Sequence, residues 1–184
     1  MKRALKLAIL ASLVCLIAAV TAFAQTSASV VSTHPALSVD KVKQGARFQA
    51  AVVVDINAGY HINSRHPSET YLIPTVLKLD KLQGITAGLV SYPKGEVKKF
   101  SFSEQPLSVY EGRAVLKFTA TASPSLAVGS HSIHGKLTVQ ACNDQACLQP
   151  KTIDVEVPFE VVGPDAQANP ANGDIFGTAG GKRR

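Results

Sequence analysis

Apolar residues alternate with other residues through most of this sequence, and this pattern predicts a chain built of β-strands. In residues 48–56 the even-numbered positions are Phe, Ala, Val, Val and Ile, whereas Gln and Asp occur among the odd-numbered ones. The same period of two runs through residues 114–121 and 153–161. Successive side chains of a strand point to opposite faces, so this period indicates strands with one buried face.

Shorter segments extend this pattern, and Gly, Pro and Asn residues separate them. Further strands are predicted at residues 60–63, 75–79, 86–92, 107–110 and 132–141. About eight short strands at a spacing of about 8–12 residues are typical of an all-β protein, an antiparallel immunoglobulin-like β-sandwich. A small barrel is the alternative. Pro158 lacks a backbone N–H, which predicts that the last strand lies at an edge or is bulged there.

The N-terminus has the pattern of a cleaved export signal. Three basic residues within the first six precede an apolar run over residues 7–20, which ends in Ala-Phe-Ala at 22–24. The run is shorter than the roughly 20 residues that span a bilayer. We therefore predict a signal peptide over residues 1–24, an exported mature protein that is periplasmic or secreted, and no membrane insertion after cleavage. An uncleaved anchor is the alternative.

Charge and composition argue against a nucleic-acid partner. Loss of Lys2, Arg3 and Lys6 with the signal lowers the formal net charge from +6 to +3, and the chain has no Trp and few aromatic residues. With 46% hydrophobic residues the chain is too apolar for global disorder. We expect a flexible leader over residues 25–35, one sandwich domain over 36–162, and a disordered tail over 163–184.

Two cysteines remain after the signal is removed, Cys142 and Cys147, and they lie on either side of a predicted turn. Four intervening polar or small residues allow the chain to reverse, which can bring the two Cα atoms to the roughly 4.4–6.8 Å of a disulfide. Such a bridge closes a small loop, and small loops gain little stability from a disulfide. An exchangeable disulfide would make better use of this position than a purely structural one.

Two other interpretations of the cysteine pair stay open at this point. A structural disulfide in a non-catalytic exported interaction domain is common. A metal-carrier site is the third possibility, since the two cysteines could be joined by histidines from elsewhere in the chain, namely His34, His61, His66, His131 and His134. His61 and Asn63 themselves alternate with Tyr60 and Ile62, which predicts a solvated or hydrogen-bonded surface position for the two polar side chains.

Several segments in fixed order carry a resemblance to a known family. They are Gly-Tyr-His-Ile-Asn at 59–63, Pro-Thr at 74–75, Tyr-Pro at 92–93, residues 102–110, and Gln-Ala-Cys-Asn-Asp-Gln-Ala-Cys-Leu-Gln-Pro at 140–150. The chain resembles the N-terminal periplasmic domain of DsbD, the transmembrane thiol:disulfide interchange reductase of bacteria. The resemblance covers residues 36–162, and the cysteine hairpin followed by Pro is its most specific part.

The resemblance implies an immunoglobulin-like fold whose cysteine pair carries electrons, an activity of the protein-disulfide reductase type. A thioredoxin-like protein or domain would be the electron donor, and oxidised periplasmic proteins would be the acceptors. Cys147 would be the sulfur that partners attack, and Cys142 would be the resolving thiol. Neither a metal nor an organic cofactor is expected.

In that family a loop covers the disulfide and moves aside when a partner docks. The matching stretch, which we call the cap loop, consists of Phe102, Ser103, Glu104, Gln105, Pro106 and Leu107, and Phe102 is expected to cover the sulfurs.

This sequence also departs from the family. Its cysteines are separated by four residues, whereas the best-known relatives have five. It has neither a multi-helix membrane segment nor a thioredoxin-like domain after the sandwich, so we expect a stand-alone relative whose electron source is a separate protein.

Overall fold

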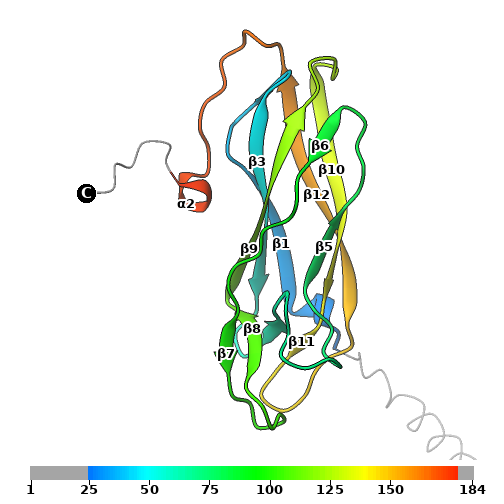
Figure 1. Cartoon of the computed structure of the whole chain (residues 1–184), viewed down its shortest axis with the longest axis vertical. Coiled ribbons are helices and arrows are strands. Elements are labelled where there is room, and N and C mark those ends of the chain that lie inside the picture. Colours follow the sequence, from blue (N-terminus) through cyan, green and yellow to red (C-terminus); the bar gives the residue numbers. More distant parts are fainter. Residues whose placement is uncertain (1–24, 178–184) are drawn as a thin grey trace, which may run out of the picture.

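The structure is a computed structural model that describes residues 25–177, and it is built almost entirely of β-strands (Figure 1). One short 3-10 helix and one short α-helix stand at the two ends of the described chain. In chain order the elements are η1 (Ser27–Ser29), β1 (Val31–Leu37), β2 (Val42–Lys43), β3 (Arg47–Ile56), β4 (His61–Asn63), β5 (Val76–Leu79), β6 (Ile85–Ala87), β7 (Glu96–Lys98), β8 (Leu107–Glu111), β9 (Arg113–Ala122), β10 (Gly129–Val139), β11 (Ala141–Cys142), β12 (Lys151–Val162) and α2 (Gly173–Phe176).

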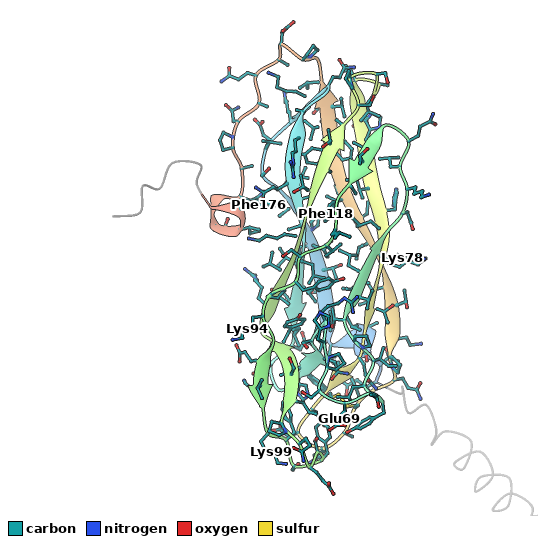
Figure 2. The ribbon with its side chains drawn as sticks, viewed as in Figure 1. Glu69, Lys78, Lys94, Lys99, Phe118 and Phe176 are labelled. Atoms are coloured by element: carbon teal, nitrogen blue, oxygen red, sulfur yellow. A yellow bond between two sulfur atoms is a disulfide. The ribbon has the colours of Figure 1, made fainter. Side chains whose placement is uncertain are left out.

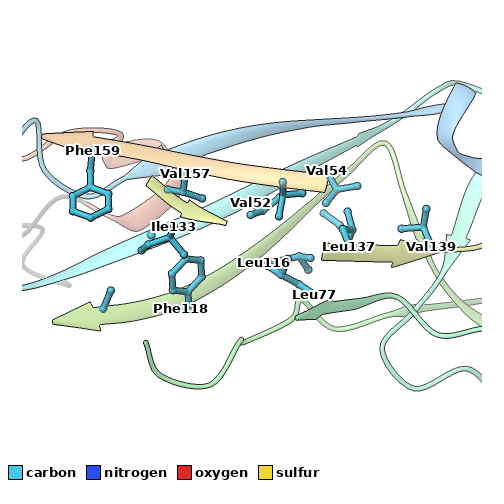
Figure 3. Packing of buried hydrophobic residues seen from close by; sticks show 14 of the residues in the cluster. Val52, Val54, Leu77, Leu116, Phe118, Ile133, Leu137, Val139, Val157 and Phe159 are labelled. Carbon is cyan, nitrogen blue, oxygen red and sulfur yellow. The ribbon is translucent and has the colours of Figure 1, made fainter. Parts of the chain in front are cut away.

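Two four-stranded sheets form a long sandwich, in the orders β1-β3-β9-β6 and β2-β12-β10-β5. Their neighbouring strands are antiparallel except for the two-residue pairing of β2 with β12. The apolar faces that alternation predicted pack against each other, with Val52 and Leu116 from one sheet meeting Ile133, Leu137 and Val157 from the other (Figure 3). The predicted antiparallel immunoglobulin-like sandwich is confirmed.

A third sheet, in the order β11-β4-β8-β7, closes one end of the sandwich. Ala141, Ile62 and Tyr110 are in register across three of its strands, and all three side chains belong to the main core. The neighbouring residues on these strands therefore point to the opposite face. That opposite face carries Cys142 and the groups around it.

The N-terminal segment differs from the flexible leader expected over residues 25–35. Ser27–Ser29 form η1, and Val31–Leu37 pair with β3 as an edge strand. The sequence here is polar and contains Pro35, so alternation is weak. Backbone pairing with β3 keeps this segment ordered, whereas the pattern of its apolar residues did not indicate a strand.

The C-terminal segment also differs from the expected disordered tail over residues 163–184, as far as Gly177. The side chain and backbone N–H of Asn169 both donate to the Asp40 carboxylate, at 2.9 and 2.7 Å. Ile175 and Phe176 pack on Ala36, Ala51 and Val53, on the outer face of the first sheet (Figure 2). This short apolar pair in a polar stretch covers a face that would otherwise expose a patch of small apolar residues.

Pro158 lies where the sequence predicted an edge. It is opposite Ser132 of β10, and on the other side of β12 the strand β2 pairs only at Val161 and Val162. No ladder on that side therefore needs the missing N–H.

In residues 25–177 no helix has the length and apolar character to cross a membrane. The predicted signal peptide at residues 1–24 lies outside the described residues.

Candidate active site

The two cysteines form a disulfide across a tight hairpin after β11. Their Sγ atoms are 2.05 Å apart and their Cα atoms 3.9 Å apart, just under the range used for the sequence prediction. Backbone bonds from Asn143 N to Ala146 O and from Leu148 N to Ala141 O flank the pair. The cysteines therefore occupy a non-hydrogen-bonded antiparallel pair, in which the Cα atoms approach most closely.

The turn between the cysteines is held by the side chain of its first residue. Asn143 Oδ1 accepts hydrogen bonds from the N–H groups of Gln145 and Ala146, both at 2.9 Å. An Asn at the start of a turn satisfies the backbone donors that a tight reversal leaves free. The polar residues between the cysteines thus define the hairpin that brings the sulfurs together.

Ser27 fastens the base of this hairpin to the N-terminal segment. Its hydroxyl accepts a hydrogen bond from Ala141 N at 3.0 Å and donates one to Gln149 O at 2.7 Å, and the residue has no exposed surface. Ala141 and Gln149 lie on opposite arms of the hairpin. The segment that the sequence predicted to be flexible therefore helps to position the disulfide.

We expect Ser27→Ala to lower the free energy of unfolding by about 1–3 kcal/mol, because the buried N–H of Ala141 would lose its acceptor and the carbonyl of Gln149 would keep only the backbone N–H of Ser27 as a donor. Urea unfolding of the oxidised protein would measure this. Ser29→Ala is the matched control, since its hydroxyl bonds only to Thr26 O in an exposed position; it should change stability by less than about 0.5 kcal/mol. Equal effects of the two substitutions would contradict the role of Ser27.

Three residues in register place the disulfide beside a histidine and a carboxylate. Cys142 of β11 is opposite His61 of β4, and His61 is opposite Glu111 of β8. Opposed residues of antiparallel strands share a face, with Cβ atoms about 4.5–5.5 Å apart. Glu111 is in turn bound by the Lys98 ammonium from β7.

The cap loop lies over this face, in the segment after β7 where Lys99 is labelled in Figure 2. The Lys99 ammonium donates to the carbonyl of Ser103 at 2.8 Å and also to that of Glu104. The Ser101 hydroxyl donates to the carbonyl of Asp144, in the cysteine hairpin. Ser101, the residue directly before the cap loop, therefore ties this segment to the cysteine hairpin through a hydrogen bond.

Aromatic side chains fill the space between the cap loop and the sheet. The rings of His61 and Phe100 are stacked with centroids 4.0 Å apart, and Phe102 lies 5.6 Å from Phe100. Phe102 and Cys147 both pack against a small cluster of buried residues that is separate from the main core and consists of Leu72, Phe100, Leu107 and Val109.

The two sulfur-bearing residues differ in exposure. Cys142 is completely buried, whereas Cys147 is partly exposed at the edge of the small cluster. Of the predicted cap-loop residues, Glu104, Gln105 and Pro106 are exposed, Ser103 is buried, and Leu107 is already the fully buried first residue of β8. Phe100 was not predicted to belong to the site, although its spacing of two from Phe102 was an available signal.

The prediction that His61 and Asn63 lie at the surface is wrong. His61 is 2% exposed and Asn63 is fully buried. Asn63 Nδ2 donates to Ile73 O and to Gln140 Oε1, at 3.1 and 3.0 Å. Alternation correctly placed these side chains on the face opposite Ile62, but the cap loop and the segment after β4 cover that face. A strand pattern does not reveal such a cover.

Burial lowers the pKa of His61; Lys98 adds to this effect, whereas Glu111 and Asp144 oppose it. The folded protein therefore binds fewer protons at this site than the unfolded chain, whose histidine has a pKa of about 6.5. The stabilisation from a neutral His61 is complete above about pH 6.5 and is lost as pH falls below it.

We expect His61→Gln to reduce this acid-side loss of stability, as measured by urea unfolding at pH 7.5 and 5. The exposed His134 provides the control substitution His134→Gln, which should retain the wild-type pH dependence. An unchanged slope in the His61 variant would contradict a buried neutral imidazole.

The other histidines considered as metal ligands are distributed over the molecule. His34 pairs with Asp55 at 3.5 Å on the first sheet, and His131 stacks on Phe159 of β12. His66 and His134 are both exposed. Within residues 25–177 no three His, Cys, Asp or Glu side chains come close enough together to hold a metal ion.

Three of the 19 solved chains that match this structure are compared with it. The Neisseria meningitidis DsbD N-terminal domain in the reduced form is 20% identical, with a TM-score of 0.43, and the match covers 75% of this chain and 88% of that one. The N-terminal periplasmic domain of ScsB from Proteus mirabilis is 10% identical, with a TM-score of 0.46 and coverage of 71% and 46%. A family 123 glycoside hydrolase from Clostridium perfringens is 12% identical, with a TM-score of 0.35 and coverage of 73% and 27%.

Comparison with protein families gives a direct assignment. No curated protein matches the sequence significantly. The family model for the N-terminal part of the thiol:disulfide interchange protein DsbD matches residues 27–158, from the serine that anchors the hairpin to the middle of the last strand. This span includes the disulfide, the cap loop and strands of all three sheets. The chain belongs to the DsbD N-terminal domain family.

Proposed function

We propose that this protein is a periplasmic thiol:disulfide exchange module that passes electrons from a thioredoxin-like donor to oxidised partner proteins through Cys142 and Cys147. The observation that carries the proposal is the unequal exposure of the two residues. Cys147 is partly exposed beside Phe102, whereas Cys142 is fully buried. A partner thiolate can therefore reach one sulfur once the loop moves, while the other remains protected for the second step.

The exchange proceeds in two displacements. A donor thiolate attacks Cys147 Sγ, the disulfide breaks, and Cys142 leaves as a thiolate that takes up a proton. The donor's second thiol, after losing its proton, then attacks the mixed disulfide and releases Cys147. Two electrons and two protons have moved to the cysteine pair. The reverse sequence reduces an acceptor disulfide, so neither direction requires a metal or an organic cofactor.

The position of the bridge favours exchange over a structural role. The cysteines are five positions apart, and a loop of this size gains only about 2 kcal/mol from cross-linking in the chain-entropy model, compared with about 3 kcal/mol for 15 residues. Cys147 packs against the small cluster and not against the main core. Reduction should therefore leave the sandwich folded.

The cap loop supplies a means of controlling access. Its link to the cysteine hairpin is the bond from Ser101 to Asp144 together with the packing of Phe102. Both interactions contribute little stabilisation compared with the packing of the main core. A docking partner can therefore displace the loop at a modest cost in free energy. We expect the loop to shield the disulfide from small oxidants and reductants between partner encounters.

The reduction potential of the cysteine pair tests this proposal. The purified protein would be equilibrated with glutathione buffers, its thiols alkylated, and the fraction reduced measured by mass. A potential between about −180 and −270 mV, with the reduced protein still folded, would support exchange. A potential below about −300 mV would indicate a structural disulfide, and the protein would then be better described as a non-catalytic exported interaction domain.

A further inference from the structure

One buried polar atom beside the disulfide has no hydrogen-bond partner. In the described part of the chain, His61 Nε2 and Asn63 Oδ1 are the buried side-chain atoms that lack one. Leaving such an atom unpaired in a protein interior costs free energy. The imidazole is held in this position by its stacking on Phe100, 4.0 Å between ring centroids. An unpaired imidazole nitrogen beside a disulfide indicates that a hydrogen-bond donor for it becomes available only in another redox state of the protein.

The register of the sheet identifies that partner. His61 is opposite Cys142 in the pairing of β4 with β11, so the two side chains are neighbours on one face. In the oxidised protein the Cys142 sulfur is bonded to Cys147 and has no proton to donate. After reduction it becomes a thiol, and a thiol is a hydrogen-bond donor.

The charged groups around the imidazole come from three elements. Glu111 of β8 lies opposite His61, Lys98 of β7 binds Glu111 and also contacts Glu96, and Asp144 belongs to the cysteine hairpin. The lysine offsets part of the negative charge. Burial favours the neutral imidazole in the resting protein, and two carboxylates lie near enough to stabilise it when it becomes an imidazolium.

We propose that His61 Nε2 accepts the proton of the Cys142 thiol in the reduced protein and so generates the thiolate for the resolving step. This role rests on the proposed function. Cys147 first loses its proton to solvent and forms a mixed disulfide with the acceptor, and the acceptor thiolate that this step releases takes up a proton. Cys142 then transfers its proton to Nε2, its sulfur bonds to Cys147 Sγ, and the acceptor's second sulfur leaves as a thiolate that takes the proton from the imidazolium through solvent.

The size of the effect follows from thiol ionisation. A cysteine thiol with a pKa of about 8.5 is only about 3% thiolate at pH 7. Cys142 is fully buried, and a buried site disfavours the charged thiolate. A base on the residue opposite Cys142 makes the thiolate available during the reaction, so its loss should slow the resolving step at least about 30-fold at pH 7.

Rapid-quench measurements on the full-length protein would test this role. Reduced wild type and the His61→Gln and His61→Phe variants would be mixed with oxidised glutathione, quenched with an alkylating reagent, and analysed by mass for the mixed disulfide and the re-formed bridge. We expect both variants to form the mixed disulfide within about twofold of the wild-type rate but to resolve it at least about 30-fold more slowly at pH 7, with the difference diminishing as pH rises above about 9.

The substitutions separate proton transfer from packing. His61→Phe retains a ring that can stack on Phe100 but has no nitrogen, so a wild-type resolving rate in this variant would overturn the proposal in favour of packing. His134→Gln, at an exposed position, should resolve at the wild-type rate. An unchanged rate in both His61 variants, with normal exchange by the wild type, would overturn the role of His61 and leave the proposed function intact. Failure of the wild type to form the mixed disulfide would overturn the proposed function and this role together.

Discussion

Replacing Cys142 with serine is expected to trap a partner protein as a stable mixed disulfide at Cys147. Serine has nearly the size of cysteine but does not attack a disulfide at neutral pH, so the resolving step is lost. A well-oriented intramolecular nucleophile acts at an effective concentration on the order of 10⁵ M. External thiols at millimolar concentration replace it poorly, and resolution should slow by more than about 1000-fold. Non-reducing electrophoresis after reaction of the variant with a thioredoxin-like protein in its disulfide form, or with another oxidised acceptor, would detect the complex.

The reciprocal substitution provides the control for the order of attack. Cys147→Ser leaves Cys142, which has no exposed surface. This variant should form a mixed disulfide at least about tenfold more slowly than Cys142→Ser. Equal or faster trapping by Cys147→Ser would show that partners attack the buried sulfur and would reverse the two roles. Circular dichroism of both variants would verify that the sandwich remains folded without the bridge.

Truncation of Phe102 to alanine is expected to speed reduction of the disulfide by a small dithiol about tenfold. The ring packs with Cys147 against the small cluster, and its partial burial contributes to keeping the loop closed. Burying roughly 55 Å² of apolar surface stabilises the closed loop by about 1.4 kcal/mol. If the substitution removes this contribution, the population of the open loop rises about tenfold. Stopped-flow measurement of the reduction by dithiothreitol would give the rate.

Phe176→Ala is the matched control for this experiment. Its ring is also half-buried, but it packs on Ala36, Ala51 and Val53, on the outer face of the first sheet. Its removal should leave the reduction rate of the disulfide unchanged. If both variants accelerate reduction equally, the effect reflects general loosening of the fold and not the cap loop. If neither does, access to the sulfurs does not depend on Phe102.

The sandwich could be predicted from sequence because its signal is local. Residues 48–56 become β3 and residues 114–121 fall within β9, and their predicted apolar faces are the ones that meet in the core. Alternation appears wherever one side of a strand is buried. It can therefore be recognised in the sequence without knowing which strand pairs with it. The edge strand at Val31–Leu37 was missed because it is held largely by backbone pairing, which leaves little trace in residue type.

The candidate site was predictable in part. The cysteine hairpin and its family were evident from the residues around Cys142 and Cys147, and the family assignment is confirmed. The surroundings of the pair were not evident. His61 was expected at the surface, and Phe100 and Ser27 were not connected with the site. Phe100, His61 and Ser27 lie 47, 86 and 120 positions before Cys147, and no spacing rule links them to the hairpin.

The sequence by itself determined most of the strands, the sandwich, the cysteine pair and the family, because each depends on a pattern within a short stretch of chain. Only the tertiary structure decided what surrounds the sulfurs. Strand register set His61 opposite Cys142, and the loop after β7 covered that face and made it a second small core. Burial depends on what every other segment does, so a polar residue in an alternating strand has no fixed environment until the sheets have packed.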